Sequence, residues 1–392
     1  MSLLARQRHN TGSSGGGIAG AARAIRRFEA GPRPQKGELN AQSPRPPGRS
    51  TFGSLALIVA IIGFGAAVFA YTAGWLSPQR LTADRMVDAF TPPGDAPPLG
   101  HRRNHAKGIC FTGIFESNGA GSALSQAPVF TRGRYPALGR FNLATPNPNA
   151  PDATVRVRGL GLSITTPDGQ EWRSAMIDPP VFPVATPQAF HELLVASGSK
   201  DPDAMKAFAA AHPEFATFGA WAKSAPWTAS YAEERFNSLN SFVFVDGAGA
   251  EHAVRWSLLP AAQPVAVSPE DLAKRGPDYL EREIAERVRG GPQRWTMVVT
   301  VANPGDPTAD PTKAWPEDRR TVEVGTLIVQ QIEVERDGPC RDINFDPTIL
   351  PSGIRTSDDP FPAARSAAYA KSYNRRTAEA KDYPRIAPEA KP

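Results

Sequence analysis

Cysteine is the scarcest reactive side chain in this sequence of 392 residues. Cys110 and Cys340 are the two present, so one disulfide is the most that the chain can form. This count excludes a disulfide scaffold and a zinc site built from cysteines. The sequence leaves open whether the two residues pair or remain free buried thiols.

Several short motifs with known chemistry are also missing. No G-x-G-x-x-G or Walker A sequence occurs between a predicted strand and a helix, so the usual signals for nucleotide binding are absent. The chain has no H-E-x-x-H, C-x-x-C or G-x-S-x-G, and its six histidines are too scattered to predict a zinc site. A hydrolase or metalloprotease therefore has little support.

Charge is absent from residues 50–79, whose centre is the apolar stretch Leu55–Trp75. A membrane-spanning helix needs about 20 mostly apolar residues, so residues 51–75 are predicted to be one transmembrane helix that attaches the chain to a membrane. The positively charged residues before it predict a cytoplasmic N-terminus, with the rest on the periplasmic side of a bacterial-type inner membrane. A cleaved signal peptide is the alternative, although its apolar region is usually only about 7–15 residues long.

The net charge of +5 comes from the N-terminal tail. Residues 1–49 hold nine basic and two acidic side chains, whereas the remainder holds 35 basic and 37 acidic ones. The near-neutral remainder gives no electrostatic support for binding nucleic acid, and no nucleic-acid partner is expected. Residues 1–50 are rich in Gly, Ser, Pro and Arg, which predicts a disordered cytoplasmic tail.

The residues after the apolar stretch divide into a linker (76–100), a folded domain (101–376) and a polar C-terminal tail (377–392). Apolar and alternating patterns predict strands at Gly108–Phe115, Val155–Thr165, Ser241–Val245, Trp295–Val301 and Glu323–Glu333. Helices are predicted at Ala83–Ala89, Pro187–Ala196, Asp203–Ala211, Pro269–Val288 and Pro360–Ser372. Mostly sequential strands with helices between them indicate an α+β fold with an antiparallel sheet or barrel.

One basic segment carries a specific pattern. Arg102–Gly108 reads RRNHAKG and leads directly into the first predicted strand. It resembles the R-x-x-H-A-K-G segment of the haem catalases.

Other segments resemble the same family in the same order, and together they extend from His101 to Tyr369. They are Gly139–Asn142 (GRFN), Pro151–Gly159 (PDATVRVRG), Thr312–Pro316 (TKAWP), Phe345–Pro347 (FDP), Pro351–Ile354 (PSGI) and Asp358–Tyr369, which contains R-x-x-x-Y. Each match is weak alone, but their shared order makes chance an unsatisfactory explanation. The resemblance is closest to the shorter catalase-related peroxidases, because the chain stops soon after Tyr369.

The resemblance implies a catalase-type antiparallel β-barrel with inserted and flanking α-helices, and haem b as the cofactor. Tyr369 would be the metal ligand. A free tyrosine has a pKa of about 10, so a phenolate ligand needs a cation nearby, and Arg365 lies one helical turn away. His105 would be the catalytic residue that moves protons between the peroxide oxygens.

The resemblance implies further cofactor-binding residues. Arg102 and Arg140 would pair with the haem propionates, which are buried carboxylates that need charge compensation. Phe141, Phe182 and Phe190 would line the pocket.

The chain departs from the family pattern beside the expected peroxide site. Ile177 falls where the family usually has an asparagine, unless the alignment shifts by one residue and places Asp178 there. Isoleucine forms no hydrogen bond to peroxide, which weakens the case for dismutation of hydrogen peroxide. Asn142 replaces a serine that orients the histidine in many relatives, and it retains the ability to hydrogen-bond.

These observations predict a membrane-anchored haem peroxidase. It would reduce organic hydroperoxides, with hydrogen peroxide as a further candidate substrate, and would use an unidentified external electron donor. Two alternatives remain: a true catalase that dismutates hydrogen peroxide, and a haem-binding or partner-binding protein without turnover. A homo-oligomer is also an open expectation.

Overall fold

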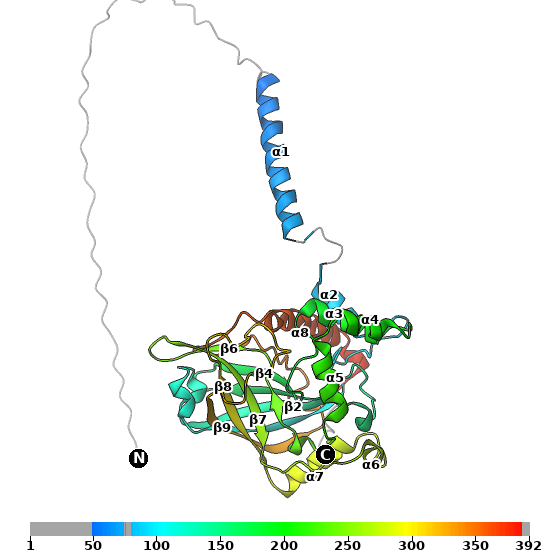
Figure 1. Ribbon diagram of the computed structural model, residues 1–392, viewed down its shortest axis with the longest axis vertical. Coiled ribbons are helices and arrows are strands. Elements are labelled where there is room, and N and C mark those ends of the chain that lie inside the picture. Colours follow the sequence, from blue (N-terminus) through cyan, green and yellow to red (C-terminus); the bar gives the residue numbers. More distant parts are fainter. Residues whose placement is uncertain (1–48, 74, 76–79, 386–392) are drawn as a thin grey trace, which may run out of the picture. The chain divides into compact units, whose positions relative to one another are not determined.

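The computed structural model describes residues 49–73, 75 and 80–385, which belong to two separate units that divide after Ser77. Of the tail predicted at 1–50, residues 1–48 lie outside the described residues, and 49 and 50 begin the first helix. In the first unit, α1 (Arg49–Thr72) is one continuous helix (Figure 1). Its residues Phe52–Thr72 are long and apolar enough to cross a membrane.

The second unit is built on a closed antiparallel barrel of eight strands. The strands follow the order β1-β2-β3-β4-β5-β7-β8-β9, and β9 pairs back with β1. They are β1 (Gly108–Ser117), β2 (Gly133–Leu143), β3 (Arg158–Thr165), β4 (Glu171–Ile177), β5 (Phe236–Asn237), β7 (Glu251–Pro260), β8 (Gln293–Val301) and β9 (Thr321–Glu333). Two short strands, β6 (Phe242–Val245) and β10 (Ile354–Thr356), extend the sheet from β7.

Alternating side chains fill the barrel. In β8, for example, Trp295, Met297 and Val299 are buried in the core while the residues between them are less buried. This period of two is what a strand with one core-facing side requires. The largest fully buried apolar side chains of the unit are aromatic: Phe111, Phe115, Phe130, Phe141, Tyr231, Phe236, Phe242, Phe244, Trp256 and Trp295.

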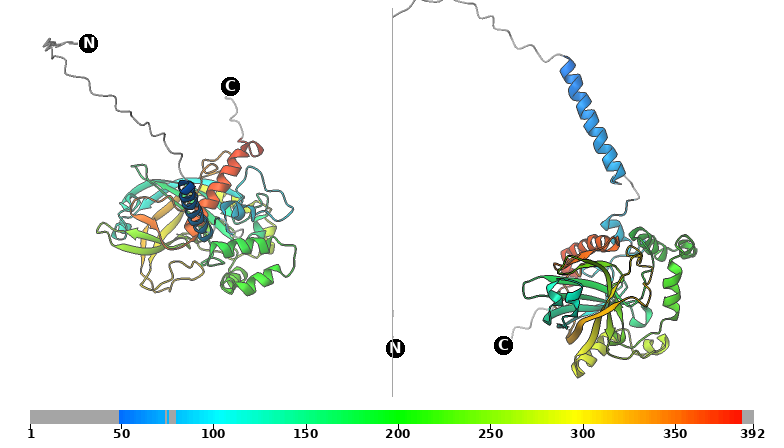
Figure 2. Two further views of the ribbon diagram at one scale, coloured as in Figure 1. Left: turned by 90° about the horizontal axis from the view of Figure 1, so that it is seen from above. Right: turned by 60° about the vertical axis from the view of Figure 1, so that its left-hand side comes forward.

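Helices lie at opposite ends of this unit (Figures 1 and 2). At one end lie α2 (Ala83–Asp88), α3 (Pro187–Ser197), α4 (Ala204–Ala211) and α8 (Phe361–Ala378), and at the other lie α6 (Pro269–Ala273) and α7 (Tyr279–Gly290). Helix α5 (Phe215–Ser224) follows α4. Short 3-10 helices occupy Ala120–Ala123, Pro128–Phe130, Asp152–Thr154, Tyr231–Glu233 and Ala380–Asp382.

The structure confirms the predicted fold class and corrects several element boundaries. The single helix expected at 269–288 is two helices, because Gly276 adopts a φ of +91° and Pro277 follows it. The strand expected from Val155 begins at Arg158, after a 3-10 turn. The apolar pattern did not predict strands β2, β4, β5, β7 and β10 or helix α5.

The predicted linker contains part of the folded unit. Thr82 caps α2 by accepting a hydrogen bond from the Arg85 amide, and Met86 and Val87 are buried against Ala368 of α8. On its outer side, Asp84 and Asp88 pair with Arg375 of α8 at 2.7 and 2.5 Å. Helix α2 therefore packs against α8 and is part of the second unit.

Cys110 and Cys340 form a disulfide. Cys110 lies in β1 and Cys340 lies in the irregular segment after β9, and both are fully buried. The two cysteines are therefore paired rather than free thiols.

Candidate active site

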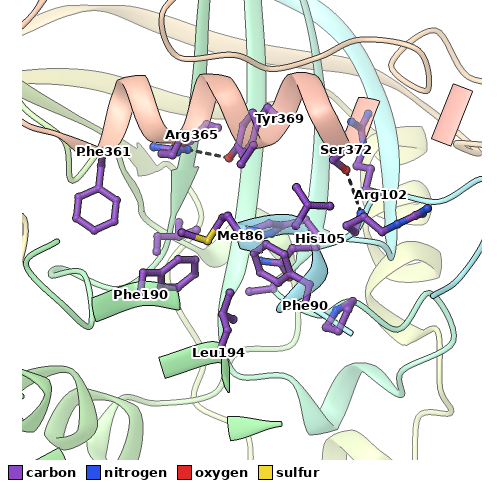
Figure 3. A pocket seen from close by; sticks show the side chains of 18 of the residues that line it. Met86, Phe90, Arg102, His105, Phe190, Leu194, Phe361, Arg365, Tyr369 and Ser372 are labelled. Carbon is purple, nitrogen blue, oxygen red and sulfur yellow. Dashed lines mark hydrogen bonds between the residues drawn. The ribbon is translucent and has the colours of Figure 1, made fainter. Parts of the chain in front are cut away.

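A cavity of about 570 Å³ lies where β2, β3 and β4 meet α2, α3 and α8. Most of its wall is apolar, and polar groups enter it from the segment before β1, from β2 and from α8 (Figure 3). The apolar side chains include Met86, Val87, Phe90, Ile177, Phe182, Phe190, Leu193 and Leu194. A mostly apolar cavity with a few convergent polar groups is the usual form of a cofactor site.

His105 is held at this cavity by Asn142. Its Nδ1 atom lies 2.6 Å from Asn142 Oδ1, and an amide oxygen can only accept, so Nδ1 carries the proton and Nε2 is left as an acceptor. Gly159 makes room for the amide, since a Cβ there would lie 2.4 Å from Asn142 Oδ1. His105 itself has a φ of +53°, a conformation that few residues other than glycine adopt.

Burial keeps the His105 ring neutral. Removal from water, together with the positive charges of Arg140, Arg365 and Arg102, lowers its pKa to about 4, although the Asn142 hydrogen bond opposes this shift. A neutral imidazole with a free Nε2 can accept a proton from a peroxide at any pH well above 4.

Arg365 and Tyr369 project from successive turns of α8 into the same cavity (Figure 3). Arg365 Nη2 donates to Tyr369 Oη at 3.1 Å and to the Ala175 carbonyl at 2.8 Å, and Nη1 donates to Asn240 Oδ1 at 2.6 Å. Among the described residues, no carboxylate accepts a hydrogen bond from Arg365. The guanidinium therefore brings a positive charge beside the Tyr369 hydroxyl, as a phenolate ligand to ferric haem would require.

Three arginines form the polar end of the cavity. Arg140 makes a two-pronged ion pair with Glu335 at 2.6 and 2.7 Å, and Arg102 lies 3.4 Å from the same carboxylate. Arg376, on the cavity face of α8, donates to the Arg341 carbonyl at 2.6 Å.

Burial and the neighbouring charges shift the pKa values of two groups in this cluster. Burial and the neighbouring Arg140 and Arg376 lower the pKa of Arg102 to about 9. Burial disfavours the charge on Glu335, but Arg140 and Arg102 outweigh it and lower the pKa of the carboxyl. Three guanidinium groups around one buried carboxylate leave positive charge in the wall, which fits the two carboxylates of a haem.

The structure brings most of the predicted site residues together. Arg102, His105, Arg140, Phe182, Phe190, Arg365 and Tyr369 all line the cavity. Phe141 does not: it lies in the barrel core with its ring stacked on Tyr231 at 5.1 Å. Since Arg140 and Asn142 face the cavity, the residue between them on β2 must face the opposite side.

Ile177 lines the cavity, and Asp178 does not replace it. The Asp178 carboxylate is buried away from the cavity, where it accepts from Arg156 Nη1 at 2.6 Å and from the Arg158 amide at 2.8 Å. An alignment shift by one residue is therefore incompatible with the structure.

Arg376 was not predicted as a site residue, and α2 was predicted as a helix at Ala83–Ala89 but not as part of the cavity wall. Arg376 is seven residues after Tyr369, or two helical turns, so its place on the same face of α8 could have been predicted from spacing. The sequence offered no comparable reason to place Met86, Val87 and Phe90 at the cavity. A short amphipathic helix after an apolar segment does not reveal what it packs against.

An antiparallel barrel with a neutral histidine, an arginine-supported tyrosine and an arginine cluster around one apolar cavity is the arrangement expected of a haem oxidoreductase. Comparison with known proteins identifies the group more closely. Residues 98–388 match the family model described as catalase. The chain belongs to the catalase family, whose members generally bind haem and act on peroxide.

Two relatives align with this chain over almost their whole length. The catalase-related peroxidase of Synechococcus elongatus is 34% identical over 330 residues, which cover 83% of this chain and 95% of the relative. The catalase-related peroxidase of Mycolicibacterium paratuberculosis is 33% identical over 304 residues, which cover 76% and 95%. These comparisons confirm the predicted resemblance to catalase-related peroxidases.

Solved catalases share the fold. Catalase A from Saccharomyces cerevisiae aligns with a TM-score of 0.63 at 20% identity, covering 70% of this chain and 61% of its own. A bacterial catalase gives 0.63 at 22% identity, covering 74% and 60%. The chain thus spans about three fifths of the length of these solved catalases.

Proposed function

We propose that this protein is a membrane-anchored peroxidase with haem b, which reduces organic hydroperoxides with electrons from an external donor. The observation that carries the proposal is the placement of His105 and the Arg365–Tyr369 pair around one cavity. The reaction converts a hydroperoxide, two protons and two electrons to an alcohol and water.

The side chains have complementary roles. Tyr369 would bind the haem iron, and Arg102, Arg140 and Arg376 would hold the carboxylates of the haem. When bound, haem supplies a redox-active iron at which the peroxide O–O bond is cleaved. His105 Nε2 would take the hydroperoxide proton and return it to the departing oxygen, while Asn142 holds the ring in the required tautomer.

Ile177 supports an organic substrate over dismutation. It provides an apolar wall where a hydrogen-bonding side chain would help to orient a second hydrogen peroxide. Contact with such a wall stabilises a bound alkyl group by removing it from water, whereas hydrogen peroxide has no apolar surface to bury. The true-catalase alternative differs in one measurable respect, because dismutation needs no external reductant.

Membrane attachment is proposed for the apolar helix α1. The stretch Phe52–Thr72 has the length and hydropathy of a membrane span, and basic residues precede it. The disulfide supports a non-cytoplasmic location, since such bonds persist in oxidising compartments. A site attached to a membrane would meet lipid hydroperoxides, which belong to the proposed substrate class.

The first test is the absorption spectrum of the full chain, purified in detergent after expression with haem supplied. We expect a ferric spectrum with the charge-transfer bands of a phenolate ligand, and its loss in Tyr369→Phe. Tyr373→Phe is the matched control, because Tyr373 lies on the same helix and lines the same cavity. A chain without haem, or a spectrum indifferent to Tyr369, would contradict the proposal.

Turnover is tested next with an organic hydroperoxide and with hydrogen peroxide, each with and without a phenolic reductant. Consumption of the organic hydroperoxide that requires the reductant supports the peroxidase. Oxygen release from hydrogen peroxide without reductant identifies a catalase, and haem binding without either activity identifies a binding protein. Ile177→Asn should raise oxygen release relative to the parent chain if this position limits dismutation.

A further inference from the structure

The Cys110–Cys340 disulfide connects two parts of the chain that contribute to the proposed haem site. Cys110 is in β1, five residues after His105, and Cys340 is five residues after Glu335. Both sulfur atoms are inaccessible to solvent, in a small apolar cluster that also contains Phe345. Phe345 lines the cavity, so the disulfide lies directly behind the cavity wall.

The segment 334–344 has neither helix nor strand and begins where the β1–β9 ladder ends, at the pairing of Cys110 with Glu333. The disulfide is a second covalent link between the segment and the barrel, in addition to the backbone that continues from β9. Gly338 packs directly on the bridge, since a Cβ there would lie 2.6 Å from Cys110 Sγ. The Cys340 amide also donates to Cys110 Sγ at 3.2 Å.

This segment holds the arginine cluster through its carboxylate and its backbone. Arg102 donates to the carbonyl oxygens of Cys340, Arg341 and Ile343 at 3.0 to 3.2 Å. Arg376 donates to the carbonyls of Arg341 and Ile343 at 2.6 and 3.3 Å.

Glu335 of the same segment completes the arrangement. Its carboxylate takes both hydrogen bonds from Arg140 and approaches Arg102. One irregular segment therefore binds all three guanidinium groups, and Arg140 also donates to the His105 and Ala106 carbonyls before β1. Without the bridge, its backbone would regain conformational freedom, and ordering it again on haem binding would oppose that binding.

We propose that the Cys110–Cys340 disulfide is a positioning element for the arginines that hold the haem carboxylates, so that haem retention depends on the oxidised bridge. The inference rests on the haem site proposed above. The bridge does not touch the iron ligand, because Tyr369 and Arg365 are held by α8, Ala175 and Asn240. Loss of the bridge should accelerate haem release and leave the phenolate spectrum of the remaining bound haem unchanged.

The test uses the full chain in detergent and compares the parent with Cys110→Ala/Cys340→Ala. Haem release is followed optically by transfer to an excess of apomyoglobin. We expect release to be about tenfold faster or more, which corresponds to about 1.4 kcal/mol. Amide hydrogen exchange of the haem-free chain should accelerate in 334–344 more than in the barrel strands.

Two further variants separate positioning from general stability. Cys340→Ser leaves β1 unaltered and should show the same faster release, which keeps the test valid if the double variant fails to fold. Glu335→Gln keeps the bridge and should also accelerate release. Combining it with the double alanine change should add less than the sum of the separate effects, because both act on the same arginines.

Several outcomes would overturn the inference. Unchanged haem release in chains proved to lack the bridge would do so, and so would strictly additive effects of the bridge and of Glu335. If the parent chain binds no haem, the proposed function itself fails. If the parent binds haem through Tyr369 but release is indifferent to the bridge, only the positioning role fails.

Discussion

The Nη2 atom of Arg365 lies 3.1 Å from Tyr369 Oη, one turn along the same helix, with amide and carbonyl oxygens as its other partners. This relationship makes Arg365 the charge that would maintain a phenolate at neutral pH. Arg365→Gln should weaken haem binding about 10–100-fold, as loss of a group supporting a metal ligand commonly does. It should also weaken the phenolate charge-transfer bands of the haem that remains bound.

A haem titration followed by the absorption spectrum measures both effects. Lys371→Gln is the control on the same helix, since Lys371 is partly exposed and pairs with Asp84 on the surface. Parental haem affinity and parental bands in Arg365→Gln would contradict the role assigned to the guanidinium.

The His105–Asn142 pair predicts the pH dependence of peroxide cleavage. Because the histidine must be neutral to accept a proton and its pKa is lowered to about 4, the rate should be constant at higher pH and fall as the pH drops through about 4. His105→Ala should lower the single-turnover rate by about 10²–10⁴-fold. Asn142→Ala should lower the rate by a smaller factor and shift the acid limb to lower pH, because the hydrogen bond raises the histidine pKa. An acid limb near 6.5 in the parent would show that His105 is not desolvated.

Glu281 predicts that the free energy of unfolding depends on pH. Burial, with the nearby Asp152 and Asp278, raises its pKa to about 7, although Lys107 opposes the shift. The unfolded chain releases this proton near pH 4.5 and the folded chain retains it to about 7, so stability is present below pH 4.5 and is lost as the pH rises through 7.

Denaturant unfolding between pH 5 and 8 tests this dependence. Glu281→Gln should unfold at higher denaturant concentration than the parent at pH 8, by roughly 2–3 kcal/mol in the free energy of unfolding. The exposed Glu286 on the same helix provides the control substitution Glu286→Gln. Equal pH profiles for all three chains would show that Glu281 is not buried as described.

Helix α2 predicts where the folded unit begins. Met86 and Val87 are 7% and 1% exposed, so a chain starting at residue 98 loses their burial while a chain starting at residue 80 keeps it. The shorter chain should be less stable by roughly 3 kcal/mol or more, since burial of each such side chain contributes about 1.5–3 kcal/mol. Denaturant unfolding of the two chains measures the difference. Equal stability would place α2 outside the cooperative unit.

The proposed anchor predicts the cellular fraction. The full chain should stay in the membrane pellet after an alkaline wash, and deletion of residues 52–72 should release it. The intact mass of the purified protein separates an anchor from a cleaved signal peptide. A mature chain that begins after residue 75 would contradict anchoring.

Part of the site could be predicted from the chain because it is local. Arg365, Tyr369 and Arg376 follow helical spacing, and RRNHAKG is one contiguous segment before a strand. The barrel was predicted from strands that follow one another along the chain, together with the family resemblance. Strands β2, β4 and β7 were missed because charged and polar residues interrupt their apolar pattern, such as Arg140 in β2, Arg173 in β4 and Arg255 in β7.

The amino-acid sequence was enough to predict the features formed by residues that are neighbours along the chain: the apolar helix, the RRNHAKG segment and the helical spacing of Arg365 and Tyr369. The direction in which Phe141 faces, the pairing of Cys110 with Cys340, and the contact of Glu335 with Arg140 from 195 positions away depend on the tertiary fold. Strand register sets the faces on which Cys110, Arg140 and Phe141 lie, because a shift of one residue would send each side chain to the other face. The path of the irregular segment after β9 brings Glu335 and Cys340 to them. The neutral state of His105 has the same origin, because it depends on burial by elements distant in sequence.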